Sequence, residues 1–255
     1  MTIPATPPAP TATSAERVAV VTNVTRYAGP GAVSALGRAG YTVVCHDEDL
    51  VEEVPRAEFE ANHRGAVACG SKTPQGAIGQ AIKRYGRVDL LVSNDVYPLQ
   101  YLPLEACEAA DLRRAIEALV VTPVSLVAKA AAEMKRQGRG YIVLITSAAP
   151  CRPEAGFSIY SSLRAGASAF AQAAARELAP HRITVNAIAP NFLESELYYP
   201  KDLWETDEGK AKLRGLVPVG RLGTPAELGA LIAFLASGSA DFITGEVIKF
   251  TGGWP

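Results

Sequence analysis

The sequence predicts a single α/β domain in which a parallel sheet carries helices on both faces. Short apolar runs that end at turn residues are typical of buried strands, and they alternate along the chain with longer helical stretches. Of the 255 residues, 48% are hydrophobic and 20% are charged, which is enough apolar material for one sizeable core. No internal repeat or second domain is evident. These observations indicate a Rossmann-like doubly wound fold.

The first third of the chain is predicted to form three strands and two helices. Val18–Thr22 and Tyr41–Cys45 are continuous apolar runs, as expected for strands buried on both faces of a sheet. Gly29–Gly40, between them, is expected to be a helix that ends on glycine. Ala66–Cys69 is a weaker strand. Pro74–Tyr85 is expected to be a helix with proline in its first turn.

The middle of the chain adds two strands and a long helix. Val88–Ser93 and Tyr141–Thr146 are the fourth and fifth apolar runs. Glu108–Gln137 has helical character, and Pro123 is expected to lie near a kink or a boundary within it. No element is predicted for the acidic and polar stretch Asp47–Glu60.

The last third begins with a helix that ends near Pro180. Ile183–Ala189 and Glu246–Phe250 are the remaining strands. Pro190–Gly223 is expected to be a long irregular segment with aromatic residues, and Pro225–Ser237 is expected to be a helix. Ligands in such folds bind at the carboxyl ends of the strands, so functional residues are expected there.

Composition excludes several classes of function. Residues 1–16 are rich in Pro, Thr and Ala and lack the apolar core of a signal peptide, so we expect a disordered tail ahead of a domain spanning 17–255. A net charge of −1 gives no electrostatic basis for binding nucleic acid or an anionic membrane. No apolar run is expected to span a bilayer, no zinc pattern is present, and the four cysteines lack a Cys-x-x-Cys pair. We therefore expect a cytoplasmic protein with reduced cysteines and no metal.

Three residues stand out as a candidate catalytic set. Ser147 follows a predicted strand, while Tyr160 and Arg164 are four residues apart and share one face of a predicted helix. A guanidinium beside a phenol favours the phenolate, so Tyr160 is a candidate base, and the serine hydroxyl is a candidate hydrogen-bond donor to the same substrate. For an isolated pair, an alternative is a surface arginine one turn from a half-buried tyrosine.

From about Arg17 to Pro255 the chain resembles the short-chain dehydrogenases/reductases. The serine and tyrosine have that family's spacing, and Arg182–Pro190 resembles its "R-V-N-x-I-x-P-G" strand. Thr244-Gly245 and Gly252-Gly253 resemble the last strand and its glycine pair. The resemblance implies the same fold.

Two features depart from the cofactor-dependent members of that family. Their phosphate loop, Thr-Gly-x-x-x-Gly-x-Gly, lets the backbone approach a pyrophosphate, but here Asn23 and Tyr27 replace two of the glycines and only Gly29 remains. Their Tyr-x-x-x-Lys motif is Tyr-x-x-x-Arg here, and an arginine stays charged in a protein without help from a cofactor. In addition, no asparagine is present in the helix before the serine strand, where those enzymes carry one.

These departures resemble the halohydrin dehalogenases, relatives that lost the nucleotide and have a halide pocket in its place. That family's Thr-x4-(Phe/Tyr)-x-Gly motif is matched by Thr22, Tyr27 and Gly29, and its Ser-x12-Tyr-x3-Arg motif by the three candidate residues above. The resemblance implies no cofactor. It also implies an aspartate that orients or balances the arginine, here Asp95, although a strand-end capping residue is an alternative.

The resemblance further implies a halide or nucleophile site and its chemistry. The tyrosine would deprotonate a vicinal haloalcohol, whose alkoxide displaces halide and closes an epoxide; in reverse, azide, cyanide, nitrite or halide opens the epoxide. Backbone N–H groups of Phe192 and Leu193 are expected to face the anion. The residues implied in the anion site are Thr22, Tyr27, Pro190, Asn191, Phe192 and Leu193, with Tyr199 and Trp204 as additional candidates for the pocket wall.

Two alternatives stay open at this point. One is a divergent NAD(P)-dependent oxidoreductase, in which Asp47 would serve as the ribose-binding acid or be an ordinary loop charge. The other is a non-catalytic binding protein on the same fold. Relatives are usually tetramers, so we expect a homotetramer built on the helices at Glu108–Gln137 and Ser158–Pro180.

Overall fold

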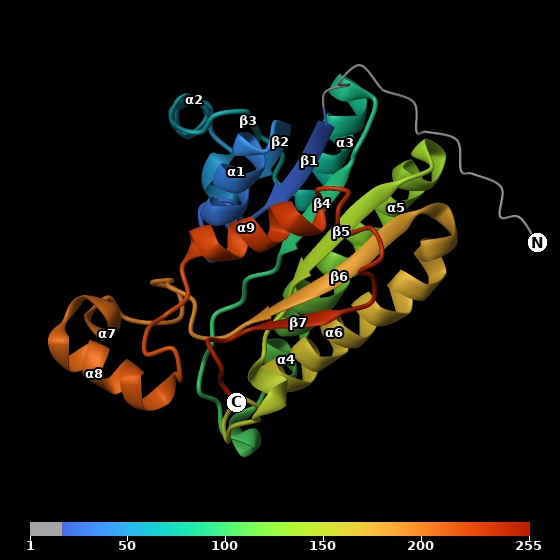
Figure 1. Cartoon of the computed structure of the whole chain (residues 1–255). Helices are drawn as coiled ribbons and strands as arrows, with labels where there is room; N and C mark the ends of the chain where they lie inside the picture. Colours follow the sequence, from blue (N-terminus) through green and yellow to red (C-terminus); the bar gives the residue numbers. More distant parts are fainter. Residues whose placement is uncertain (1–16) are drawn as a thin grey trace, which may run out of the picture.

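The computed structural model describes residues 17–255, so the expectation for residues 1–16 lies outside the described part. Seven parallel strands form one sheet in the order β3-β2-β1-β4-β5-β6-β7 (Figure 1). The strands are β1 (Arg17–Thr22), β2 (Tyr41–His46), β3 (Ala66–Cys69), β4 (Leu90–Asn94), β5 (Gly140–Ile145), β6 (Ile183–Pro190) and β7 (Val247–Phe250). The predicted doubly wound fold is confirmed, and the strand order reverses between β1 and β4.

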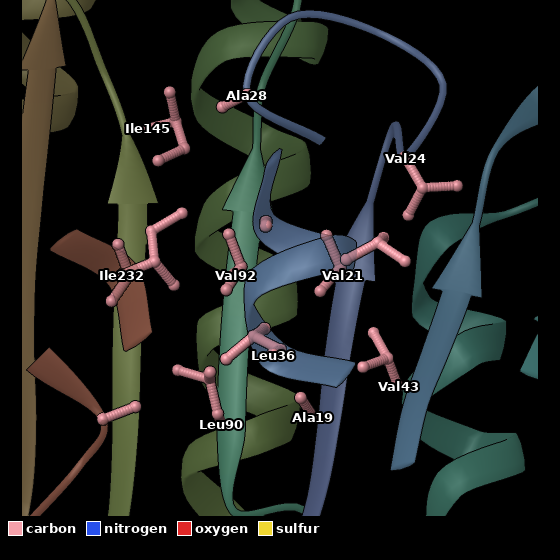
Figure 2. Packing of buried hydrophobic residues seen from close by; sticks show 14 of the residues in the cluster. Ala19, Val21, Val24, Ala28, Leu36, Val43, Leu90, Val92, Ile145 and Ile232 are labelled. Atoms are coloured by element: carbon pink, nitrogen blue, oxygen red, sulfur yellow. The ribbon is translucent and has the colours of Figure 1, made fainter. Parts of the chain in front are cut away.

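Helices cover both faces of the sheet because alternate residues of each strand point to opposite sides. Ala19 and Val21 of β1 pack with α1 and α9, as Figure 2 shows together with Leu36 and Ile232. Their strand neighbours pack with α3, α5 and α6 on the other face. The helices are α1 (Gly29–Arg38), α2 (Glu53–Asn62), α3 (Pro74–Tyr85), α4 (Ala109–Ile116), α5 (Thr122–Gln137), α6 (Ser158–Leu178), α7 (Asp202–Glu205), α8 (Asp207–Leu216) and α9 (Pro225–Leu235).

The helix expected at Glu108–Gln137 is interrupted. A five-residue π-helical turn, Glu117–Val121, separates α4 from α5 directly before Pro123. Proline lacks an N–H and clashes with the preceding turn, so the boundary lies where the sequence predicts it.

The combined helix Ala109–Gln137 is long and apolar enough to cross a membrane by length and composition alone. By that measure, the expectation that no apolar run reaches this length is wrong. Leu126, Ala130 and Met134 pack against the sheet, as the residues of a core helix in a globular domain do.

Two segments predicted to lack regular structure contain helices. Asp47–Glu60 includes most of α2, which has no fully buried residue and therefore gives no clear apolar period. Pro190–Gly223 includes α7 and α8, which project from the body of the domain (Figure 1). The hydroxyl of Thr206 accepts the N–H of Gly209 at 3.1 Å and caps α8. Helix α8 thus has a side-chain cap, whereas α2 has none, and neither helix shows a strong apolar period in the sequence.

Candidate active site

The candidate catalytic residues meet at the carboxyl edge of the sheet. Ser147 lies two residues beyond β5, Asp95 follows β4, and α6 carries Tyr160 and Arg164 in its first two turns. The guanidinium of Arg164 donates hydrogen bonds to the backbone oxygens of Asp95 at 2.7 Å and Ile145 at 3.1 Å. One side chain of α6 is therefore held by the ends of two neighbouring strands.

Arg164 is a buried cation beside a phenol. Its side chain is 1% exposed, and the guanidinium carbon lies 5.1 Å from the centre of the Tyr160 ring. Burial acts to lower the pKa of Arg164, but Tyr160, Tyr198 and Asp95 act to raise it, and the pKa is raised overall. The Nε–H group has no acceptor within residues 17–255. The site therefore holds a permanent positive charge, and its Nε–H group is unpaired in the described residues.

Asp95 supports Arg164 through its backbone. The carboxylate accepts a hydrogen bond from the Ser93 hydroxyl at 2.7 Å, and within the described residues it forms no ion pair with Arg164. Burial raises the pKa of Asp95 to about 7, although the Ser93 hydrogen bond and the charge of Arg164 both lower it. The predicted orienting contact is thus made by the Asp95 carbonyl.

The hydroxyl of Ser147 lies in a short turn and has a free proton to donate. Its oxygen accepts the N–H of Ala149 at 3.1 Å, and no described residue accepts a hydrogen bond from its hydroxyl. The next residue, Ala148, donates its N–H to the Pro190 oxygen at 3.1 Å, which ties this turn to the end of β6. The hydroxyl proton therefore remains available for a substrate oxygen.

The loop expected to bind an anion is closed by its own side chains. Phe192 has a left-handed backbone, with φ of 55°. Its N–H donates to Asn191 Oδ1 at 3.0 Å and to the Tyr199 hydroxyl at 3.1 Å, and that hydroxyl donates to Asn191 Oδ1 at 2.7 Å. The Phe192 N–H therefore faces Tyr199, and an anion has to displace that hydroxyl to reach it. No hydrogen bond from the Leu193 N–H is found in the described part of the chain.

Two residues expected at the site have other surroundings. Thr22 is 1% exposed and its hydroxyl accepts the Asn94 N–H at 3.0 Å, so its side chain joins β1 to β4 beneath the turn. Trp204 packs against a small apolar cluster of α8 and the following loop, which also contacts Phe192. Thr22 therefore contacts the end of β4, and Trp204 contacts the cluster on which Phe192 also packs. The members of that cluster are Leu213, Val217 and Leu222.

Comparison with known proteins identifies the family. A family model described as enoyl-(acyl carrier protein) reductase matches residues 28–255. The cis-4-hydroxycyclohexanecarboxylate dehydrogenase of Sinomonas cyclohexanicum is 33% identical over 248 residues, which cover 94% of this chain and 97% of that protein. The chain belongs to the short-chain dehydrogenase/reductase superfamily.

Two solved structures within this superfamily are more similar. One, described as a dehalogenation enzyme, is 38% identical with a TM-score of 0.89 and covers 94% of this chain and 98% of its own. The other is a halohydrin dehalogenase bound to ethyl (2S)-oxiran-2-ylacetate; it is 41% identical with a TM-score of 0.89 and covers 93% and 97%. The resemblance to halohydrin dehalogenases expected from the sequence is confirmed.

The dinucleotide of the superfamily does not fit the turn between β1 and α1. Asn23 and Tyr27 occupy left-handed positions, with φ of 49° and 52°, where the phosphate loop of the cofactor-dependent members has glycine. The Tyr27 ring is 9% exposed and lies edge-on to Tyr198, with ring centres 4.8 Å apart. Gly29 is retained because a Cβ there would overlap the Asn23 carbonyl. A pyrophosphate would have to pass through side chains that are packed in place.

The structure adds aromatic residues that the sequence did not single out. The hydroxyl of Tyr198 donates to the Tyr97 oxygen at 3.3 Å, and burial raises the pKa of Tyr198, with Tyr160 adding to this and Arg164 opposing it. Trp254 packs edge-on to Phe192, with ring centres 5.7 Å apart. Tyr198 could have been found from the sequence, because it is next to Tyr199, a candidate for the pocket wall. Nothing in the sequence indicates that Trp254 contacts Phe192.

A hollow beside Tyr160 was also missed. It lies between the loop after β4 and the start of α6, and these segments are joined by a hydrogen bond from the Leu102 N–H to the Gly156 oxygen at 2.9 Å. Gly156 has φ of 81°, and a Cβ there would overlap the exposed ring of Tyr101. The apolar lining residues are Tyr97, Pro98, Leu102, Phe157 and Ile159.

Proposed function

We propose that the protein is a halohydrin dehalogenase, which converts vicinal haloalcohols reversibly to epoxides and opens epoxides with halide, azide, cyanide or nitrite. The observation that carries the proposal is the position of Arg164. This buried cation lies beside Tyr160, is held by two strand ends, and needs no cofactor to remain charged. The blocked β1–α1 turn supports it independently.

The forward reaction follows from these positions. Tyr160, beside the buried cation of Arg164, acts as the base and takes the hydroxyl proton of the haloalcohol. The resulting alkoxide forms a carbon–oxygen bond at the adjacent carbon as the carbon–halogen bond breaks, and halide leaves with the electron pair. The free Ser147 hydroxyl donates to the substrate oxygen. In reverse, an anion attacks the epoxide carbon and Tyr160 returns the proton to the oxygen.

Two features near Tyr160 are candidates for binding the two parts of the substrate. The loop of Asn191, Phe192 and Leu193 offers backbone donors and apolar walls to the halide, although Tyr199 has to give way. The hollow lined by Phe157 and its neighbours has room for little more than a water molecule, so it would have to widen to take the carbon substituent.

Release of bromide from a vicinal bromohydrin tests the proposal. We expect purified protein to release bromide without added NAD(P), and Tyr160→Phe to abolish the release while the protein stays folded. Bromide release that Tyr160→Phe leaves unchanged would contradict this assignment of the base.

A divergent NAD(P)-dependent oxidoreductase is the second candidate, favoured by sequence relatives that are named dehydrogenases and reductases. It predicts enhanced NADH or NADPH fluorescence on binding, whereas the proposed function predicts none. A protein inert towards haloalcohols and epoxides, with no nucleotide binding, would instead favour a non-catalytic role.

We also propose that the protein works in the cytoplasm as a homotetramer. The exposed face of α6 carries small residues, including Ala165, Gly166 and Ala169, which allow another helix to approach closely. The mass measured by light scattering after gel filtration tests the tetramer, and a monomeric mass would contradict it.

A further inference from the structure

The β1–α1 turn stores backbone strain. Asn23 and Tyr27 both have left-handed backbones, with φ of 49° and 52°. That conformation is strained for an L-residue, and it is unusual for a bulky side chain. Such strain persists only where the surroundings fix the conformation. The contacts around this turn therefore have to supply that support.

Asp47, directly after β2, supports the turn from the outer side. Its carboxylate is fully buried, and Oδ2 accepts both the N–H of Thr25 at 2.9 Å and its hydroxyl at 2.8 Å. Oδ1 accepts the Asp49 N–H at 3.1 Å and lies 3.6 Å from the guanidinium of Arg26. Both carboxylate oxygens are thus occupied by donors of the same chain.

Asn94, at the end of β4, supports the turn from the inner side. Its amide nitrogen donates to the backbone oxygens of Asn23 at 2.9 Å and Arg26 at 2.8 Å. The Asn23 side chain donates in return to the Asn94 oxygen at 2.6 Å. Tyr27 directly follows the residues that Asp47 and Asn94 hold, and its ring packs edge-on to Tyr198.

We propose that Asp47 is a positioning residue that fixes Tyr27 as a wall of the anion site. It stands after β2, where a cofactor-dependent relative would present an acid to the ribose, but its acceptor capacity is used by Thr25, Asp49 and Arg26. The inference rests on the proposed function, because it takes the cleft around Tyr27 to bind an anion. Asp47 acts through Tyr27 and touches no reacting atom.

A carboxylate is required at this position because donors converge on both of its oxygens. In Asp47→Asn one oxygen becomes an NH2 group, which sets a donor against either Thr25 or Asp49. The turn then loses its outer support, while the hydrogen bonds of Arg164 and the turn at Ser147 are untouched. Anion binding should therefore weaken more than the chemical step.

Bromide affinity is the decisive measurement. It is obtained from the rise in Tm with bromide concentration at constant ionic strength, and separately from inhibition of the dehalogenation by bromide. We expect Asp47→Asn to raise the bromide dissociation constant roughly tenfold, a change of about 1.4 kcal/mol, with kcat within about twofold of wild type. Glu48→Gln is the matched control: it also removes a carboxylate contact of Arg26, but an exposed one, and should leave bromide affinity unchanged.

A Tyr27→Gly parent protein distinguishes positioning of the Tyr27 ring from a general effect of Asp47 on stability. In Tyr27→Gly there is no ring to position, so adding Asp47→Asn should not weaken bromide binding further. If Asp47→Asn does not fold, Thr25→Val is the substitute: it removes the hydroxyl contacts of Thr25 with Asp47 and Asp49 but keeps its N–H bond to Asp47. It should weaken bromide binding about threefold, in the same direction.

Three outcomes would overturn the inference. The first is that folded Asp47→Asn, or Thr25→Val in its place, lowers Tm without bromide but keeps wild-type bromide affinity. The second is that the wild type binds NADH and Asp47→Asn does not, which would make Asp47 a ribose acceptor. The third is a wild type that binds no bromide. A wild type that binds bromide but releases none from a bromohydrin would contradict only the proposed reaction.

Discussion

Replacing Arg164 by lysine keeps the positive charge but removes the fork of nitrogens. The guanidinium reaches the oxygens of Asp95 and Ile145 from two different nitrogens, and the side chain is 1% exposed. A lysine ammonium is a single point on a flexible stem, so it cannot span both acceptors in the same way. At least one buried carbonyl at a strand end loses its donor.

The expected magnitudes follow from that loss. A hydrogen bond to a charged group contributes roughly 1.5–3 kcal/mol, so the free energy of unfolding should fall by about that amount. For a domain of this size, about 2–4 °C is lost per kcal/mol, which predicts a Tm lower by about 3–12 °C. Because the cation no longer has a fixed place beside Tyr160, kcat for bromide release should fall about 100-fold, near the lower end of general acid–base effects.

Thermal unfolding and bromide release at saturating bromohydrin measure both effects. Arg164→Met, which lacks the charge and both hydrogen bonds, should be more severe in each assay. Arg176→Lys is a control on the exposed side of the same helix and should change neither. An Arg164→Lys protein with wild-type Tm and kcat would refute the reasoning, because a point charge would then be sufficient.

Three further predictions concern the surroundings of the site. Because the folded pKa of Asp95, about 7, lies above its unfolded value, the native state holds a proton that the unfolded state has released; stability should therefore fall by about 1.4 kcal/mol per pH unit between about pH 4 and 7. Asp95→Asn should remove this pH-dependent fall in stability, measured as Tm against pH. If Tm falls with pH as steeply as in the wild type, Asp95 is not the group responsible. Of the two tryptophans, Trp254 touches Phe192 directly, so the fluorescence change on anion binding should persist in Trp204→Phe and vanish in Trp254→Phe. Gly156→Ala should cost about 1 kcal/mol or more in chemical denaturation and raise KM for haloalcohols with large substituents, but not for the smallest ones; equal changes in KM would argue against the hollow as the substituent site.

The sheet could be predicted from the sequence, whereas several helices could not. All seven strands lie within two residues of their predicted bounds, because most of them are buried on both faces and form continuous apolar runs. Helix α2 has no fully buried residue, and α8 buries only Gly209 and Leu213, so neither has the periodic apolar face that reveals a helix.

The site was predictable only where spacing determines geometry. Tyr160 and Arg164 share a helix face, so their proximity follows from their separation by one turn. The contact of Trp254 with Phe192 depends on how the C-terminal segment folds back over the sheet, which no local pattern specifies. The bond between the Phe192 N–H and Tyr199 likewise depends on the conformation of a loop.

That bond has a consequence for turnover. Because the Phe192 N–H already has acceptors in Asn191 and Tyr199, an arriving anion exchanges one hydrogen bond for another and gains little net free energy from it. The departing anion, in turn, leaves no bare donor behind, since the tyrosine hydroxyl takes its place. In the proposed reaction, such an exchangeable partner would hold the anion loosely and speed its release after each turnover.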